Sequence, residues 1–405
     1  MEHRFFRNDS FRIAYYLIAY TLYTAIAGSF DVAFTLRMTG SFVALTRLYL
    51  FYYSCLAASF VCATFLVSSG KFSRGFRFNL FFQFCIGMLM YLFMPNKEHS
   101  LMLVPYFALK GVSEGFFWST RHASITCLTK NEGRDRFLLS LQVGTVFVSV
   151  VMPLIAGIFM HFNSVKAGFS GVYLGAALAA LLSLLLGPVI VSTAPPRPDL
   201  RRFKTFLFSR ENKPWRRYIF FSAINGSLAL VCAGVLNVGV LKTEFNIGIF
   251  TSGAALLSAV FLITVRKRLK GKNTRRIVWV ARGATGDFVG RLVYTLFLSI
   301  PSLIIKAFCD SFLSPLRSIF SENIIRKRSD LMAISEGYTV LEPFLFQEIF
   351  ILFARIIGFS LCTLVFTLFP VNAFLAARII LGILAFAPFL DLFLLSRIEK
   401  ETCAK

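Results

Sequence analysis

Residues 194–217 read APPRPDLRRFKTFLFSRENKPWRR, and this stretch decides how the chain is divided. It holds eight Lys/Arg and four prolines, and apolar runs long enough to cross a membrane lie on both sides. Six such runs precede it and six follow it. We therefore expect a basic linker between an N-terminal half, residues 1–193, and a C-terminal half, residues 218–405.

The composition predicts a chain that is solvated largely by lipid. Hydrophobic residues make up 57% of its 405 residues and charged residues only 16%, too little polar surface for a soluble protein. The formal net charge of +23 lies mainly in short loops, and no nucleic-acid-binding motif accompanies it. Nucleic acid is therefore not an expected partner. The eight cysteines form no C-x-x-C pair, so neither a metal site nor a disulfide is expected.

Helical spans of about 20 apolar residues can be placed along the whole chain. The first half gives spans at residues 11–36, 41–67, 76–94, 101–125, 137–160 and 168–191, and the second half gives 218–241, 247–265, 277–300, 302–320, 345–369 and 373–396. The break at Pro301 is the tightest join. The expected fold is an all-α membrane protein of 12 transmembrane helices in two pseudo-symmetric six-helix halves.

The basic residues predict the orientation of these spans. The two termini, the linker and every second loop together carry 32 Lys/Arg, and the opposite set of loops carries four. Because cytoplasmic loops are enriched in Lys/Arg, we expect both termini and the linker to be cytoplasmic, where the basic linker could also touch anionic lipid headgroups.

The two halves share a charged signature. Residues 110–121 and 306–317 both follow K-x3-acid-x-F-x4-R at an offset of 196, and the same offset places Lys71 and Arg74 on Lys267 and Lys270. Two matches in one register indicate internal duplication. Repeats of this kind place a solute site at their interface near the middle of the membrane.

Several short motifs, together with the six-plus-six arrangement, resemble the major facilitator superfamily over nearly the whole chain. These are GKFSRGFR at residues 70–77, GFFW at residues 115–118 followed by Arg121, and PLIAG at residues 153–157. The first of them lacks the family's acidic residue, which casts doubt on the usual charge lock of that loop. The resemblance implies a bacterial inner-membrane carrier without cofactors, monomeric, whose first and fourth spans of each half line a central cavity.

Charged residues inside spans are the candidate site, because a buried charge in a membrane is costly. Lys110 and Glu114 are four residues apart, as are Lys306 and Asp310, so each pair can form an ion pair on one helix face. The pairs either line the cavity, with Glu114 or Asp310 as proton carrier, or simply neutralise one another. Two first-span residues on one face, Tyr20 and Asp31, either join this site or lie near the outer surface.

Other charges are expected to serve gating or structure. Glu348 and Arg355, seven apart in the eleventh span, suggest a conformational lock, and Asp287 and Arg291 suggest a structural pair. The residues expected at span ends or in loops are Arg47, Arg74, Arg121, Arg317, Arg378 and Asp391. Of these, Arg47, Arg378 and Asp391 are expected to reach water.

No catalytic motif, nucleotide-binding loop or metal-ligand cluster occurs, so an enzyme is not expected and transport would be driven by a gradient. The sequence thus predicts a secondary transporter of a small organic solute, with proton coupling as one option. The alternative is a membrane receptor or assembly scaffold that uses a transporter fold without transporting, favoured by the degenerate loop at residues 70–77.

Overall fold

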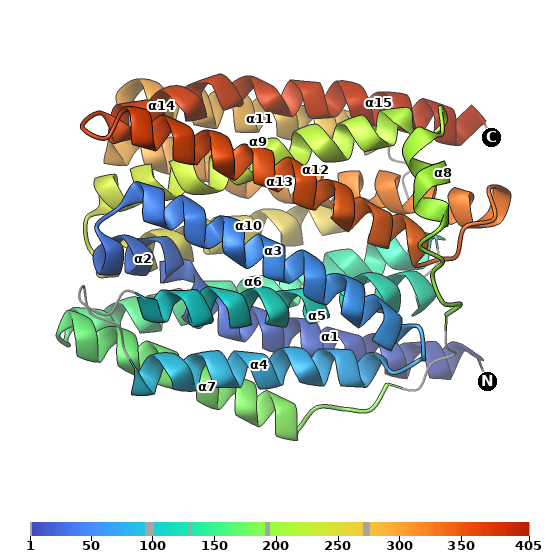
Figure 1. Cartoon of the computed structure of the whole chain (residues 1–405), viewed down its shortest axis with the longest axis horizontal. Coiled ribbons are helices and arrows are strands. Elements are labelled where there is room, and N and C mark those ends of the chain that lie inside the picture. Colours follow the sequence, from blue (N-terminus) through green and yellow to red (C-terminus); the bar gives the residue numbers. More distant parts are fainter. Residues whose placement is uncertain (1, 94–100, 129–130, 191–194, 270–275, 405) are drawn as a thin grey trace.

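The computed structural model describes residues 2–93, 101–128, 131–190, 195–269 and 276–404, and every regular element in these ranges is helical (Figure 1). In chain order the helices are α1 (Glu2–Ile26), η1 (Gly28–Phe30), α2 (Asp31–Thr39), α3 (Phe42–Val67), α4 (Phe72–Leu92), α5 (Leu103–Leu128), α6 (Asn131–His161), α7 (Val165–Leu185), α8 (Arg202–Phe208), α9 (Lys213–Leu241), α10 (Glu244–Leu269), α11 (Arg276–Phe297), α12 (Ile300–Ser335), α13 (Glu342–Leu368), α14 (Ala373–Ile383), η3 (Leu384–Phe386) and α15 (Ala387–Ala404).

Within the described residues, nine helical segments are long and apolar enough to cross a membrane. Together with the fold comparison below, they make this a multi-pass integral membrane protein. The three other expected spans coincide with α5, α11 and α12, and these helices carry several charged residues each.

The first and last spans are each interrupted by a turn of 3-10 helix. The first span was expected to be continuous, but α1 ends at Ile26, and η1 tightens the chain before α2 begins at Asp31. The break at Pro301 is confirmed: α11 ends at Phe297, and the Ser299 side chain caps α12 by accepting from the amide of Ser302.

Helix α12 corrects the predicted tenth span. We expected residues 317–328 to be a basic cytoplasmic loop, but the helix continues to Ser335. Arg326 and Arg328 are buried there, because both find hydrogen-bonding partners inside the protein. The segment 131–136, also expected to be a loop, is likewise helical as the start of α6.

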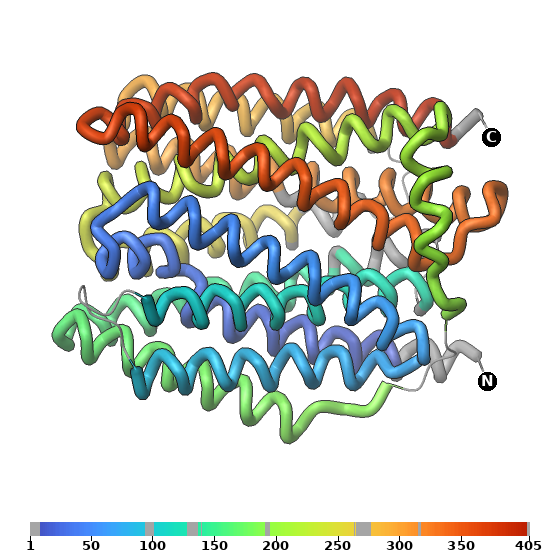
Figure 2. The backbone as a smooth tube through the Cα atoms, in the orientation of Figure 1, coloured from blue at the N-terminus to red at the C-terminus, as the bar shows by residue number. Residues whose placement is uncertain are grey.

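The helices lie side by side with roughly parallel long axes, and both termini and α8 lie at one end of the bundle (Figures 1 and 2). Two prominent contacts join helices from different halves of the sequence: α3 packs against α13, and α6 packs against α10. The second contact is close. A Cβ atom on Gly248 would lie 2.6 Å from the carbonyl oxygen of Pro153 and 3.0 Å from the Cα of Gly157.

Candidate functional site

Lys110 pairs with a different acid from the one predicted. Its ammonium group forms an ion pair with Asp31 at the start of α2, and the hydroxyl of Tyr106 donates to the same carboxylate at 2.6 Å. Asp31 is buried among the helices, and its carboxylate is bonded to Lys110. The i,i+4 pair Lys110–Glu114 does not form, because the break at η1 brings the Asp31 carboxylate to Lys110.

Glu114 is held by aromatic donors instead of a lysine. The Tyr52 hydroxyl donates to its carboxylate, and the indole of Trp118 lies 3.4 Å from the same oxygen. Tyr20 lies beside this group, stacked on Phe117 with ring centroids 3.5 Å apart. Neither Tyr52 nor Trp118 was predicted to belong to the site: Tyr52 lies in no motif, and Trp118 belongs only to the GFFW motif.

The second half keeps one predicted pair and rearranges the other. Lys306 and Asp310 form the i,i+4 ion pair on α12. Asp287 instead bonds to Arg317, whose guanidinium also donates to Asp391 at 2.7 Å. Arg291, expected to pair with Asp287, donates to the Asn225 side chain at 3.1 Å and to the carbonyl oxygen of Leu384.

Asp391 is a further correction. We expected its side chain to reach water from a span end, but it is only 3% exposed. Helix α15 places it against Arg317 inside the bundle, so its charge is met by the guanidinium rather than by solvent.

Arg355 links the two halves of the sequence. It forms the predicted ion pair with Glu348 at 3.0 Å, and its guanidinium also lies 4.1 Å from the ring centroid of Tyr53 on α3. Cation–π contact of this kind favours a fixed orientation of both groups.

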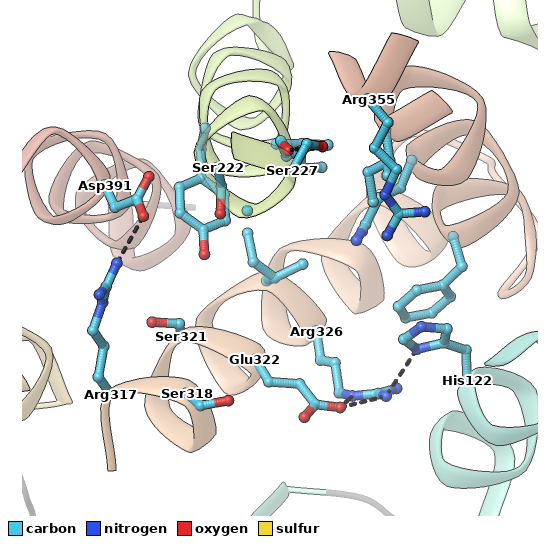
Figure 3. Close-up of a pocket in the computed structure, with 18 of the residues that line it drawn as sticks. His122, Ser222, Ser227, Arg317, Ser318, Ser321, Glu322, Arg326, Arg355 and Asp391 are labelled. Atoms are coloured by element: carbon cyan, nitrogen blue, oxygen red, sulfur yellow. Dashed lines mark hydrogen bonds and ion pairs between the residues drawn. The ribbon is translucent and has the colours of Figure 1, made fainter. Parts of the chain in front are cut away.

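A cavity of about 540 Å³ lies beside Arg317, Asp391 and Arg355 (Figure 3). Its walls come mainly from α9, α12 and α13, with Tyr53 and His122 contributed by α3 and α5. Its polar lining includes the hydroxyl or charged groups of Ser222, Ser227, Ser314, Ser318, Ser321, Arg317, Glu322, Arg326, Arg355 and Asp391.

A second cavity of about 550 Å³ adjoins the first. The two share Gly226, Leu230, Ser314 and Ser318 in their linings. The lining of the second includes the charged residues Asp287, Arg291, Lys306 and Asp310. Lys110, Glu114, Asp31 and Tyr20 line neither of these two cavities, so the structure does not gather all the predicted site residues around one space.

A cross-linked network of charges lies at the edge of the first cavity. Arg121 on α5 pairs with Glu322 on α12 at 3.0 Å, and Glu322 also accepts from Arg326. Arg326 reaches back to α5, donating to Thr126 at 2.7 Å and lying 3.1 Å from Nδ1 of His122. The network therefore joins the two halves of the sequence through α5 and α12.

Glu322 was missed because it lay in the expected loop, although its i,i+4 spacing to Arg326 was a usable signal. Burial raises the pKa of its carboxyl, but the guanidinium groups of Arg121 and Arg326 outweigh burial and hold that pKa well below its ordinary value.

The opposite end of the bundle has its own connection between the halves. Arg37 on α2 forms an ion pair with Glu244 on α10 and donates to the carbonyl oxygen of Lys242 at 3.0 Å. The hydroxyls of Thr46 on α3 and Thr363 on α13 lie 2.8 Å apart. Arg74, predicted to serve gating, is exposed near the start of α4 and has no ion pair among the described residues.

Comparison with solved structures identifies the fold. The chain superposes on the human organic anion transporter MFSD10 (TM-score 0.64, 12% identity, 96% of this chain and 99% of that one). It matches the proton:xylose symporter XylE bound to 6-bromo-6-deoxy-D-glucose (0.66, 12%, 98% and 97%) and a proton-dependent oligopeptide transporter (0.68, 11%, 98% and 100%).

This is the major facilitator superfamily fold. No known family and no curated protein matches the sequence itself. Within the superfamily fold, the cavities and the connections at both ends of the bundle are the features from which a function can be argued.

Proposed function

We propose that the protein is a secondary transporter that moves a small organic solute across the membrane by alternating access. Two six-helix halves, residues 1–193 and 218–405, would rock about a site between them, with the termini and linker on the cytoplasmic side. The 32-to-four distribution of Lys/Arg supports that orientation.

The observation that carries the proposal is the first cavity, which lies between connections that join the two halves of the sequence. Its volume of about 540 Å³ is in the range of small-molecule sites, and its lining comes from both halves of the sequence. Arg121–Glu322 joins the halves on the side of α8, and Arg37–Glu244 joins them at the other end. A site that can be closed on both sides is what alternating access requires.

The balance of charge favours a neutral or zwitterionic solute. In the lining of the first cavity each arginine is bonded to an acid: Arg317 to Asp391, Arg326 to Glu322, and Arg355 to Glu348 beside the cavity. The serine hydroxyls of α9 and α12 add neutral donors and acceptors for a polar solute. Lys306 and Asp310 would contribute from the adjoining cavity, and the sequence pattern points to Glu114 or Asp310 as the carrier of a coupled proton.

A thermal-stability screen of the purified protein against a metabolite and drug library tests the proposal. A bound solute raises the apparent stability by mass action, and the same solute should accumulate in proteoliposomes. We expect Lys306→Ala and Arg355→Ala to lose the stabilisation. A ligand that stabilises the protein but is never transported would instead favour the receptor or scaffold function.

A further inference from the structure

We propose that Asp287, Asp391 and Arg317 bind the proton of the transport cycle, one proton shared by the two carboxylates, an inference that rests on the transport function proposed above. The three residues come from α11, α15 and α12. They are distinct from Glu114 and Asp310, the carboxylates to which the sequence pattern points.

The geometry joins two buried acids through one base. Asp287 and Asp391 are each 3% exposed, and both accept hydrogen bonds from Arg317 through their Oδ2 atoms. Among the described residues, neither Oδ1 atom takes part in a hydrogen bond with another side chain or with the backbone. Each carboxyl can therefore take up a proton on its second oxygen without losing its bond to the arginine.

Arg317 is the one cation in the described part of the chain that is hydrogen-bonded to these two acids. Arg291 faces the group from α11, but its hydrogen bonds go to neutral acceptors, Asn225 and Leu384. Lys306 is bonded to Asp310, which faces Asp287 as a further negative charge. The phenol of Tyr218 faces Asp391 from α9.

Two carboxylates that share one site resist ionising together. With two acids bonded to one guanidinium in a buried cluster, the first proton lost and the second belong to the pair rather than to either residue. Arg291 adds a second positive charge near both acids, and a single proton bound to the pair leaves one ionised carboxylate for the one arginine that is hydrogen-bonded to them. Binding forms one O–H bond on the carboxyl and breaks one O–H bond of a hydronium ion that arrives through the cavity, which leaves a water molecule.

Both cavities give the cluster a route to solvent. Asp391 and Arg317 line the first cavity, where Figure 3 shows their ion pair at one side, and Asp287 lines the adjoining cavity. Because the two cavities share lining residues, a proton that arrives through one can leave through the other once the halves have moved.

Helix α12 connects the cluster to the network between the halves. Arg317 and Glu322 are five residues apart on this helix, and Glu322 bonds to Arg121 of the other half. The arginine is held closely between helices, since a Cβ atom on Gly283 of α11 would lie only 2.4 Å from the Cβ of Arg317. A proton neutralises one acid and weakens its attraction for Arg317 while the hydrogen bond remains, and any shift of α12 that follows carries Glu322 with it.

The test is pH-difference infrared spectroscopy of the full-length protein reconstituted in lipid, with protons as the only ligand. Wild type should show the carbonyl band of one protonated buried carboxyl, lost as the pH rises. Asp287→Asn and Asp391→Asn should each abolish this band, because the remaining acid is paired one-to-one with Arg317 and stays ionised. Glu348→Gln, which removes a buried acid from another arginine, is the matched control and should keep the band.

Three results would contradict the shared site. The band could be missing from wild type, or it could survive in either aspartate variant. It could also vanish in Asp310→Asn or Glu114→Gln instead. If the variants misfold, wild type can be labelled with a carbodiimide, a reagent that reacts with protonated carboxyls in apolar surroundings. We expect modification at Asp287 or Asp391. If neither residue is modified, the proposal is contradicted. The infrared measurement uses no solute, so its result is independent of whether the solute screen finds a ligand.

Discussion

Lys110 shows that spacing along one helix does not identify the ion-pair partner of a residue. The spacing of four residues pointed to Glu114, but the ammonium pairs with Asp31, 79 residues earlier, while Tyr52 and Trp118 hold Glu114. Helical spacing reveals only neighbours on the same helix. The break at η1 that positions Asp31 has no comparably strong sequence signal.

The Lys110–Asp31 pair should therefore be a main support of the first half. Lys110→Ala leaves the Asp31 charge buried and unpaired, and loss of one partner from a buried pair costs about 3–5 kcal/mol. We expect a clear fall in the thermal unfolding temperature in detergent, with Glu114→Gln as the control that keeps most of the stability. Lys110→Met combined with Asp31→Leu should recover part of the loss; equal instability of Lys110→Ala and Glu114→Gln would contradict this pairing.

Glu322 should hold its connection over a wide pH range. The pKa of its carboxyl is depressed in the folded state, so its contribution to stability is present above the pKa of the unfolded chain and is lost only as pH falls through the lower folded value. The stability difference between wild type and Glu322→Gln should thus be the same at about pH 7 and about pH 5. A difference that has already disappeared by about pH 5 would contradict a folded-state pKa below the ordinary value of a glutamate.

Among the elements, α6 and α10 pack at the closest glycine contact between the two sequence halves. Replacing Gly248 with alanine places a methyl 2.6 Å from the Pro153 carbonyl, so the helices must separate. Gly253 on the same helix is the matched control, since a Cβ there meets nothing within 4 Å. We expect Gly253→Ala to be neutral or stabilising by about 0.5–1 kcal/mol, and Gly248→Ala to lower the unfolding temperature. Equal effects would mean that the contact is not tight.

The elements also show what the sequence could predict. Hydropathy and length placed α3 and α13 within a few residues, and Pro301 marked a true break. The end of α12 was missed, because the basic residues after Phe320 resemble a cytoplasmic loop. Their burial depends on distant partners, such as Asn212 for Arg328 and Thr126 for Arg326, that no local pattern reveals.

At the scale of the whole molecule, the proposed transport depends on separation of α3 from α13. The hydroxyls of Thr46 and Thr363 lie 2.8 Å apart across this contact, so cysteines at both positions are close enough for a disulfide. With a protease site inserted between Ser209 and Arg210, the cleaved halves should stay joined in the oxidised Thr46→Cys/Thr363→Cys protein and separate after reduction. Thr46→Cys alone controls for the native cysteines.

The same double-cysteine variant also tests whether the two halves must separate during transport. Oxidation should stop proteoliposome uptake of whichever solute the stability screen yields, and reduction should restore it, while the single variant transports in both conditions. The disulfide fixes the helices without altering the charges around the cavity, so the solute should still stabilise the oxidised protein. Full uptake by the cross-linked protein would show that α3 and α13 stay together, and rocking about this contact would be the wrong description of its cycle.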